Sequence, residues 1–353
     1  MLNQILENSS IENLVKIFSR SPLQQNRLHE SDAELINLPG TNITLAITMD
    51  SIVEEIETGL YTDPYLIGWM TVMVNASDLA AVGAEPLGIL INETFSSDTN
   101  GDFNNKLQRG IEDACLQCNL HILGGDTNFS SRMEMTGCAI GYISENPPMT
   151  RLGCKPGDYL FLSGNPGLGS AFALNQLKNE SLVEQFSLTY QPKSRLREGQ
   201  LLRNFATSCM DTSDGVFASL DQLMRLNNVG FRIELELENF IHADALSICK
   251  SAQLPSWLLL AGHHGEFELA FTIAQNNVDN FLECVQQNYW EPILIGEVIE
   301  DTNVRFLYNE EMISINTGQI RNLFVELNGD VQEYIKQLLD LDLTLSGGCN
   351  ETK

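Results

Sequence analysis

Short runs of alternating hydrophobic and polar residues, separated by stretches with helical spacing, fill the N-terminal half of the chain. Residues Ile43–Met49 place an apolar side chain at every second position, which predicts a half-buried strand. Asp63 followed by Pro64 is typical of a helix start and Gly83 of a helix end, so we expect a helix that reaches Val82. Similar patterns predict other elements: an N-terminal helix, the strands Leu87–Ile91, His121–Leu123 and Met133–Ile143, and a helix over Asp102–Asn119.

The C-terminal half continues this alternation of strands and helices. Residues Gly164–Ser170 form a glycine-rich loop before a helix, which is either a turn or a phosphate cradle. The loop lacks the Gly-Lys-Ser/Thr of a P-loop, so we favour a turn. The other expected elements are the strands Tyr159–Leu162, Phe231–Leu237 and Glu266–Ile273, a helix from Glu326 to about Leu341, and a loose tail after it.

A stretch rich in proline and glycine, Ser144–Gly157, lies between two predicted strands, and we place a domain boundary there. The length of 353 residues supports two domains rather than one. We therefore expect an α/β (α+β) protein with an N-terminal domain over residues 1–146, a C-terminal domain over residues 147–325, and an acidic helix and tail over residues 326–353.

The composition is that of a globular protein, with 43% hydrophobic and 19% charged residues. Twenty basic residues against 47 acidic ones give a formal charge of −27, which disfavours binding to nucleic acid or to anionic membranes. An anionic ligand would need cations to mediate its binding.

The most apolar stretch, Tyr65–Ala84, is a poor membrane span because Asn75, Ser77 and Asp78 would lie in lipid. A central aspartate alone costs about 2.5–3.5 kcal/mol on insertion scales. The eight cysteines are irregularly spaced, and no secretory signal precedes them. We expect a cytoplasmic protein with reduced thiols. Cys115 and Cys118 form a Cys-x-x-Cys within a helical pattern, which favours ordinary helix cysteines over redox or metal use.

Aspartates at the ends of apolar elements are the candidate chemistry. Asp50 closes a predicted strand, and Thr48 lies on the same face of that strand. A carboxylate in apolar surroundings needs a cation or hydrogen-bond donors, and basic residues are scarce nearby, so Mg²⁺ is the natural partner. For each aspartate taken alone, a role as helix cap or turn residue is favoured, and the metal hypothesis depends on their joint arrangement. The others are Asp32, Asp78 in a run of small residues, Asp126 after Gly-Gly at a strand end, and Asp211 and Asp214 before a helix.

Several segments, in order and spacing, resemble those of the thiamine-monophosphate kinases. This family belongs to the AIR synthase-like (PurM-like) superfamily, with selenophosphate synthetase and hydrogenase maturation proteins. The resemblance runs from about Glu30 to Val298. The matching segments are Ser31–Ala33, Ile47–Val53, Val74–Pro86, Gly124–Thr127, Arg151–Asp158 and Asp211–Gly215, of which Val74–Pro86 is the most specific.

The resemblance implies a two-domain AIR synthase-like fold, whose N-terminal sheet pairs with its copy in a homodimer and whose C-terminal α/β domain is larger. It implies ATP and Mg²⁺ as cofactors in the cleft between the domains, and γ-phosphoryl transfer to thiamine monophosphate. Asp50, Asp126 and Asp214 would be catalytic. Arg151 and Ser213, with Thr48 and Asp126, would contact the nucleotide. The implied metal ligands are Asp32, Thr48, Asp50, Asp78, Asp126, Asp211 and Asp214.

Four positions depart from the family pattern. Ser31 replaces the first aspartate of a pair, and Met49 replaces a hydroxyl residue beside Asp50. On the acceptor side, Glu57 stands for a histidine and Gly265 for an acidic residue, so these two positions mark the expected substrate site. His263 and His264 could reach the acceptor or be loop residues, and the family's covering aromatic falls near Arg321–Phe324. The departures leave open two alternatives: a related enzyme with another acceptor, or a non-catalytic nucleotide-binding protein.

Overall fold

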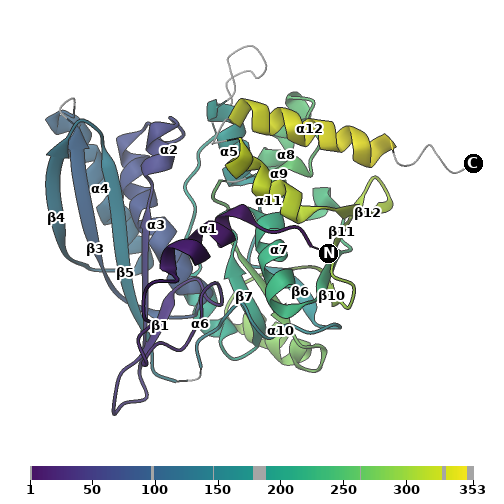
Figure 1. Cartoon of the computed structure of the whole chain (residues 1–353), viewed down its shortest axis with the longest axis horizontal. Helices are drawn as coiled ribbons and strands as arrows, with labels where there is room; N and C mark the ends of the chain where they lie inside the picture. The colour runs from purple at the N-terminus through teal and green to yellow at the C-terminus, as the bar shows by residue number, and fades with distance from the viewer. Residues whose placement is uncertain are drawn as a thin grey trace, which may run out of the picture.

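A computed structural model describes residues 2–96, 99–145, 147–177, 188–262, 264–327 and 331–347. The chain forms two β-sheets, and the helix α3 (Pro64–Ala81) lies between them (Figure 1). The first sheet has five strands in the order β1-β2-β5-β3-β4, and the second has seven in the order β12-β11-β8-β10-β6-β9-β7. All strands of the first sheet precede the proline- and glycine-rich segment 144–157, and all strands of the second follow it.

The first sheet contains the four strands expected in the N-terminal half together with β1, and three of the four extend beyond their predicted ends. Asp50 lies inside β2, and Gly124, Gly125 and Asp126 lie inside β4 rather than after a strand end. The expected short strand at 121–123 was therefore wrong in its extent, because parallel pairing with β3 continues through Ser130. The strands are β1 (Glu34–Asn37), β2 (Thr44–Ser51), β3 (Glu85–Ser96), β4 (Ile122–Ser130) and β5 (Glu134–Ile143).

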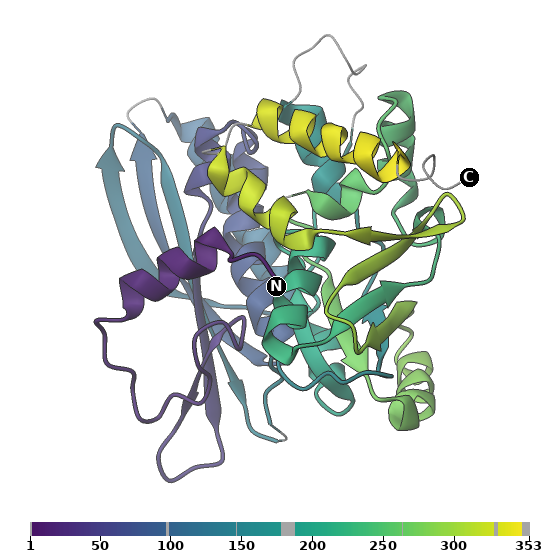
Figure 2. The ribbon, with the colours of Figure 1, turned by 45° about the vertical axis from the view of Figure 1, so that its right-hand side comes forward.

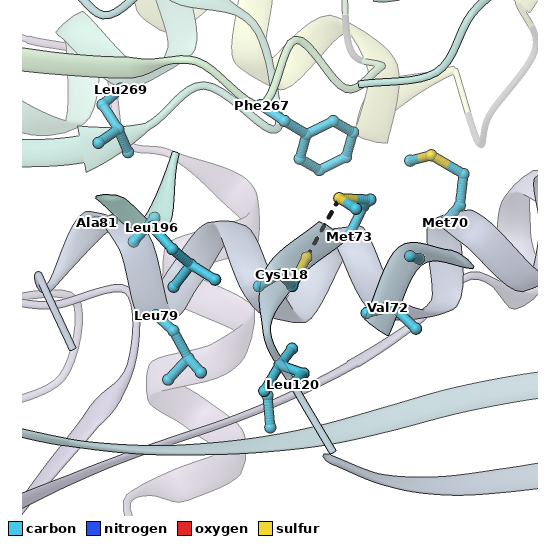
Figure 3. Packing of buried hydrophobic residues seen from close by; sticks show 14 of the residues in the cluster. Met70, Val72, Met73, Leu79, Ala81, Cys118, Leu120, Leu196, Phe267 and Leu269 are labelled. Carbon is cyan, nitrogen blue, oxygen red and sulfur yellow. Dashed lines mark hydrogen bonds between the residues drawn. The ribbon is translucent and has the colours of Figure 1, made fainter. Parts of the chain in front are cut away.

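Helix α3 contains most of the apolar stretch Tyr65–Ala84, the segment considered above as a membrane span. Its N-cap is Asp63, whose side chain accepts a hydrogen bond from Leu66 N at 3.3 Å, as the sequence predicts. Side chains of α3 are buried on several sides, against Cys118 and Leu120 and against residues near β9 (Figure 3). Among the described residues, no helix is both long and apolar enough to cross a membrane.

Close packing of α3 against α4 (Gly101–Cys118) depends on two glycines. A Cβ atom on Gly68 would overlap the carbonyl oxygen of Leu107, and one on Gly110 would overlap that of Tyr65. The helix α2 (Val53–Glu57) follows β2, and the helix α1 (Leu6–Val15) confirms the expected N-terminal helix. The close contact with α4 fixes the position of α3 between the two halves of the chain.

The second sheet and its helices contain the C-terminal elements, with three boundary corrections. The expected strand Phe231–Leu237 ends at Ile233, because the chain then turns into a short 3₁₀ helix over Leu237–Asn239. Glu266–Glu268 precede β9, since Phe267 has a positive φ of 54° that a strand cannot continue through. Glu326 ends α11 instead of starting the last helix, and the expected tail from residue 348 lies outside the described residues.

The bounds of these elements complete the description. The strands are β6 (Tyr159–Leu162), β7 (Ala206–Asp211), β8 (Gly230–Ile233), β9 (Leu269–Ile273), β10 (Ile293–Ile299), β11 (Val304–Tyr308) and β12 (Glu311–Ile315). The helices are α5 (Leu168–Leu177), α6 (Leu196–Leu202), α7 (Val216–Asn227), α8 (Ala243–Ser251), α9 (Leu258–Ala261), α10 (Val278–Gln287), α11 (Thr317–Glu326) and α12 (Val331–Gly347), with a second 3₁₀ turn at Gln275–Asn277.

A buried ionic cluster joins α7 and α11 beneath the N-terminal segment, which runs across both helices (Figure 2). The Asp221 carboxylate is fully buried and accepts hydrogen bonds from Arg225 at 2.6 and 3.1 Å, from Arg321 at 3.2 Å and from Thr317 at 2.8 Å. Arg225 also donates to the carbonyl of Asn3 at 2.6 Å. One carboxylate therefore organises two arginines and, through them, the start of the chain.

Candidate functional site

Three carboxylates from distant parts of the sequence meet where the two halves of the chain adjoin. Asp32 precedes β1, Asp78 lies in the last turn of α3, and Asp211 ends β7. One carboxylate oxygen of each lies within 4.8 Å of the others, a spacing that suits a shared metal ion. Asp78 on α3 and Asp211 on β7 come together because α3 packs against both sheets.

Strand β2 extends this cluster with Thr48 and Asp50. Thr48 Oγ1 donates to Asp78 Oδ2 at 2.5 Å and lies 3.4 Å from Asp50 Oδ2, which confirms that Thr48 and Asp50 share one face. Asn75 Oδ1 accepts from the Asp50 backbone N–H at 3.1 Å, while its amide donates to Thr71 O at 3.0 Å. Asn75 thus fixes β2 to α3 at the site. Its position in the Val74–Pro86 block was the only sequence signal for this role.

Arg151 and two serines supply donors to the cluster. The Arg151 guanidinium donates to both carboxylate oxygens of Asp32, at 3.0 and 3.3 Å. Only 1% of the Asp32 side chain is exposed. Ser213 Oγ donates to Asp211 Oδ1 at 3.1 Å, and Ser77 Oγ donates to Asp211 Oδ2 at 2.7 Å. Arg151 and Ser213, which the resemblance assigns to the nucleotide, therefore contact two of the clustered carboxylates. Ser77 was missed, although it lies in the same small-residue run as Asp78.

The carboxylates of this site repel one another. Removal from water raises the pKa of Asp78 well above its usual range, and the charges of Asp50 and Asp211 raise it further. Burial, reinforced by Asp32, raises the pKa of Asp211 to about 7. Burial likewise raises the pKa of Asp50, and the Asp214 charge adds to it, so Asp214 lies within electrostatic range of this site. One guanidinium cannot neutralise five carboxylates.

The donor set fits Mg²⁺, which prefers carboxylate and other hard oxygen ligands. The cluster offers only oxygen atoms, and its unbalanced negative charge is what a divalent cation relieves. Ser31 Oγ, adjacent in sequence to Asp32, is buried and has no hydrogen-bond partner among the described residues. The residues that would hold the ion are Asp32, Asp78 and Asp211, with Thr48, Asp50 and Asp214 close by.

We expect the metal-free protein to lose stability as the pH rises from about 4 to above 7. The pKa of Asp211 rises from 3.8 to about 7 on folding, so the folded chain holds more protons across this window. The contribution of Asp211 to the free energy of unfolding is complete below its pKa in the unfolded chain. It is lost as the pH rises through the pKa in the folded chain, at up to about 1.4 kcal/mol per pH unit. In EDTA, the melting temperature of the wild type should fall more steeply with rising pH than that of the Asp211→Asn variant. Added Mg²⁺ should remove this difference. Equal slopes would contradict the prediction.

Asp126 does not join this cluster. Along the sheet, Asp50 pairs with Gly137, Gly137 with Ile91, and Ile91 with Gly125. Asp126 is the next residue and therefore faces the opposite side of the sheet. Three strand spacings separate it from Asp50, about 14 Å. Its carboxylate is exposed and accepts a hydrogen bond from Asn128 at 2.9 Å. The expectation that Asp126 lies with the other carboxylates is thus not met in this structure.

The two acceptor-side positions have local contacts of their own, with residues outside the carboxylate cluster. Glu57 ends α2 and pairs with Arg132 at 2.6 Å, with both side chains largely exposed. Gly265 has a φ of +27°, and a Cβ atom there would overlap the Phe267 ring and approach the Tyr190 hydroxyl group. Only glycine fits this position, which explains the missing acidic residue. His264 packs edge-on against Phe324, and His263 lies outside the described residues.

The glycine-rich loop is occupied by a carboxylate of the same chain. Glu266 accepts hydrogen bonds from the backbone N–H groups of Gly167 at 2.6 Å, Gly169 at 3.3 Å and Ser170 at 2.9 Å, and from Ser170 Oγ at 2.9 Å. Glu266 caps the first turn of α5 from outside the helix. This geometry favours the turn over a phosphate cradle, because the donors that would hold a phosphate are already used.

The Cys-x-x-Cys segment is built as helix core. Cys115 and Cys118 are each 3% exposed, and Cys118 Sγ lies 3.9 Å from Met73 Sδ (Figure 3). Burial raises the pKa of the Cys115 thiol to about 12 and that of Cys118 to about 11. Thiols with raised pKa values are poor nucleophiles and poor metal ligands, which favours the structural role.

Comparison with known proteins gives two consecutive family matches. The model for the N-terminal domain of AIR synthase related proteins matches residues 30–143, and that for the C-terminal domain matches residues 155–309. The thiamine-monophosphate kinase of Escherichia coli K12 is 31% identical over 253 residues, which cover 70% of this chain and 76% of that protein. The thiamine-monophosphate kinase of Pyrococcus horikoshii is 31% identical over 270 residues, which cover 76% and 82%.

Solved structures confirm the two-domain AIR synthase-like fold. AaThiL complexed with AMPPCP and TMP superposes with a TM-score of 0.69 at 20% identity, covering 86% of this chain and 92% of that one. A chain of the HypE–HypF complex superposes with a TM-score of 0.71 at 18% identity, covering 87% and 98%. The family models, the curated relatives and the fold agree with the resemblance found in the sequence. This chain belongs to the thiamine-monophosphate kinase family of AIR synthase related proteins.

Proposed function

We propose that this chain is an ATP- and Mg²⁺-dependent kinase. It transfers the γ-phosphoryl group of ATP to the phosphate of thiamine monophosphate and releases thiamine diphosphate and ADP. The observation that carries this proposal is the convergence of Asp32, Asp78 and Asp211 from both halves of the chain. Support also comes from the curated relatives, which are thiamine-monophosphate kinases, and from AaThiL, whose complex holds AMPPCP and TMP.

The residues of the site position charge rather than remove a proton. Phosphoryl transfer depends mainly on in-line placement and on neutralisation of phosphate charge, which Mg²⁺ supplies when it is bound. Asp32 aligns the Arg151 guanidinium, a permanent cation suited to a phosphate oxygen. Ser77 and Ser213 orient Asp211. A catalytic role for Asp50 and Asp214 rests on their place in the cluster, and the same role for Asp126 stays a prediction from the resemblance.

Calorimetry and product analysis test this proposal. Purified protein with ATP, thiamine monophosphate and Mg²⁺ should form thiamine diphosphate. The variants Asp50→Asn and Asp214→Asn should each bind Mg-ATP at least about tenfold more weakly, because each loses one charge that holds the cation. If both variants fold and keep their Mg-ATP affinity, the metal assignment is wrong.

A second candidate is the same ATP site acting on another phosphorylated acceptor. Glu57 and Gly265 favour it, since neither supplies the family's acceptor contacts, and Glu57 is paired with Arg132. A thermal-shift screen of phosphorylated metabolites with a non-hydrolysable ATP analogue and Mg²⁺ distinguishes the two, because a true acceptor stabilises the ternary state. Stabilisation by thiamine monophosphate supports the first function. Stabilisation only by another compound supports the second.

We infer that the chain forms a homodimer through the outer face of its five-stranded sheet. Met49, Cys138 and Leu90 lie side by side on β2, β5 and β3, on the face turned away from α3. Met49 is 69% exposed and Leu90 is 38% exposed, which is unusual for neighbouring apolar residues on one sheet. A two-fold axis would bring this row against its copy.

The absence of disulfides among the seven described cysteines supports the cytoplasmic location that we also propose.

Placing lysine at this row should produce monomers. We expect Met49→Lys and Leu90→Lys together to shift the molar mass measured by light scattering from that of a dimer to that of a monomer, because the charges would be buried against each other. The matched control is Leu116→Lys, which changes a leucine that is 68% exposed on α4. A wild-type protein that is already monomeric at micromolar concentration would contradict the inference.

A further inference from the structure

A cavity of about 690 Å³ opens after the last residue of β6 and before the first residue of β9, next to the starts of α5 and α6. The segment between α10 and β10 also lines it. This volume is within the range of sites for small ligands, about 300–1,000 Å³. None of the residues around the cavity belongs to the carboxylate cluster, so the cavity is distinct from the proposed metal site.

The cavity brings three basic residues together in an acidic chain. Lys193, Arg195 and Arg197 all line it and lie within five consecutive residues, although the whole chain has only 20 basic residues. Arg195 is bound by Glu268 at 2.6 Å and by Glu198 at 3.4 Å. Its Nε is buried and has no hydrogen-bond partner among the described residues.

Four carboxylates also line the cavity, and three of them have partners of their own. Glu266 is held by the first turn of α5, and Glu198 and Glu268 share Arg195. Arg197 has only long contacts to Asn288, at 3.4 and 3.5 Å, and no ion pair of Lys193 occurs within the described part of the chain. Three cations against four carboxylates give the lining a formal charge of 3 − 4 = −1, but Lys193 and Arg197 have no carboxylate partner within the described part of the chain and are therefore available to an anionic group.

Two aromatic residues in the segment after α10, next to the Arg197 partner Asn288, also line the cavity. Trp290 is 9% exposed and its Nε1 donates to Ser163 O at 2.9 Å, so its ring is fixed. Tyr289 is 96% exposed and has a φ of 55°, a left-handed conformation that costs energy for a residue with a side chain. A strained and exposed tyrosine beside a cavity is well placed to stack on a planar ring.

We propose that this cavity is a second ligand site, for a compound that carries a phosphate group on a planar, amino-bearing ring. Lys193 and Arg197 would bind the phosphate, Tyr289 would stack on the ring, and the carboxylates of Glu198 and Glu268 would accept from its amino group. Two sources have this chemistry: an adenine nucleotide and a thiamine phosphate. Binding at this site needs no metal ion, because side-chain cations meet the phosphate directly.

Calorimetric titration in EDTA tests the site, since chelation disables the carboxylate cluster. The probes are ADP, thiamine diphosphate and inorganic phosphate, each titrated into the full chain. We expect one site per chain for ADP or for thiamine diphosphate, and the probe that binds identifies the source. The double variant Lys193→Glu/Arg197→Glu should weaken binding at least tenfold, and Tyr289→Ala about five- to tenfold.

Matched controls separate this site from the proposed kinase site. Lys106→Glu/Arg109→Glu reverses two exposed cations on α4 and should leave the affinity unchanged, as should Asp78→Asn. The proposal is overturned if neither ring compound binds at millimolar concentration, if inorganic phosphate binds as tightly as both, or if the cavity variants keep full affinity while remaining folded by circular dichroism. Turnover of thiamine monophosphate with Mg²⁺ is measured separately, so failure of either proposal is distinguishable from failure of the other.

Discussion

Replacing Asp78 with asparagine should reduce Mg²⁺-dependent thiamine diphosphate formation by about 10²–10³-fold or more, the scale found when one electrostatic group of an active site is removed. Asp78 is central to the cluster, since it lies within reach of Asp32 and Asp211 and accepts from Thr48. Its loss removes a metal ligand and leaves the helix α3 intact, because asparagine has the same shape. Steady-state kinetics at saturating Mg²⁺ measures this effect.

The same substitution should stabilise the metal-free protein. The pKa of Asp78 is raised well above its usual range by removal from water and by its acidic neighbours, so the charged form opposes folding at neutral pH. Urea unfolding at pH 8 in EDTA should give a larger free energy of unfolding for Asp78→Asn than for the wild type. The control is Asp63→Asn at the other end of α3, where asparagine still caps the helix. A variant with full activity, or one less stable than the wild type without metal, would refute the role given to Asp78.

Replacing Asp221 with alanine should lower the free energy of unfolding by about 3–5 kcal/mol, because removing one partner leaves a buried charge uncompensated. Asp221 is fully buried, and Arg321, which is 9% exposed in its side chain, loses one of its partners with it. Arg225 loses a two-pronged contact and thereby its hold on the N-terminal segment. Urea denaturation followed by circular dichroism measures the loss.

A double-mutant cycle distinguishes this explanation from a simple packing defect. Arg321→Ala combined with Asp221→Ala should cost less than the sum of the single changes, since the unpaired charge is then removed. Asp279→Ala on the exposed surface of α10 is the matched control and should change stability by less than about 0.5 kcal/mol. Additive losses in the cycle would show that Asp221 and Arg321 act independently.

Local patterns predicted the elements that carry the site. Asp63, Pro64 and Gly83 delimit α3 because capping and proline geometry depend on neighbouring residues alone. Thr48 and Asp50 share a face because the two-residue period of a strand requires it. The family resemblance placed Asp32, Asp78 and Asp211 at one site, and the structure brings their oxygen atoms within 4.8 Å.

Other features depend on contacts between segments that are remote in the sequence. Sheet register decides that Asp126 faces away from Asp50, and no local pattern of β4 contains that register. The donors of the glycine-rich loop are taken by Glu266, almost a hundred residues later in the chain. The sequence by itself therefore determined helix α3, most of strand β2, the family and the chemical type of the site. Tertiary structure alone decided which carboxylates converge, because burial and repulsion arise only when distant segments are packed together.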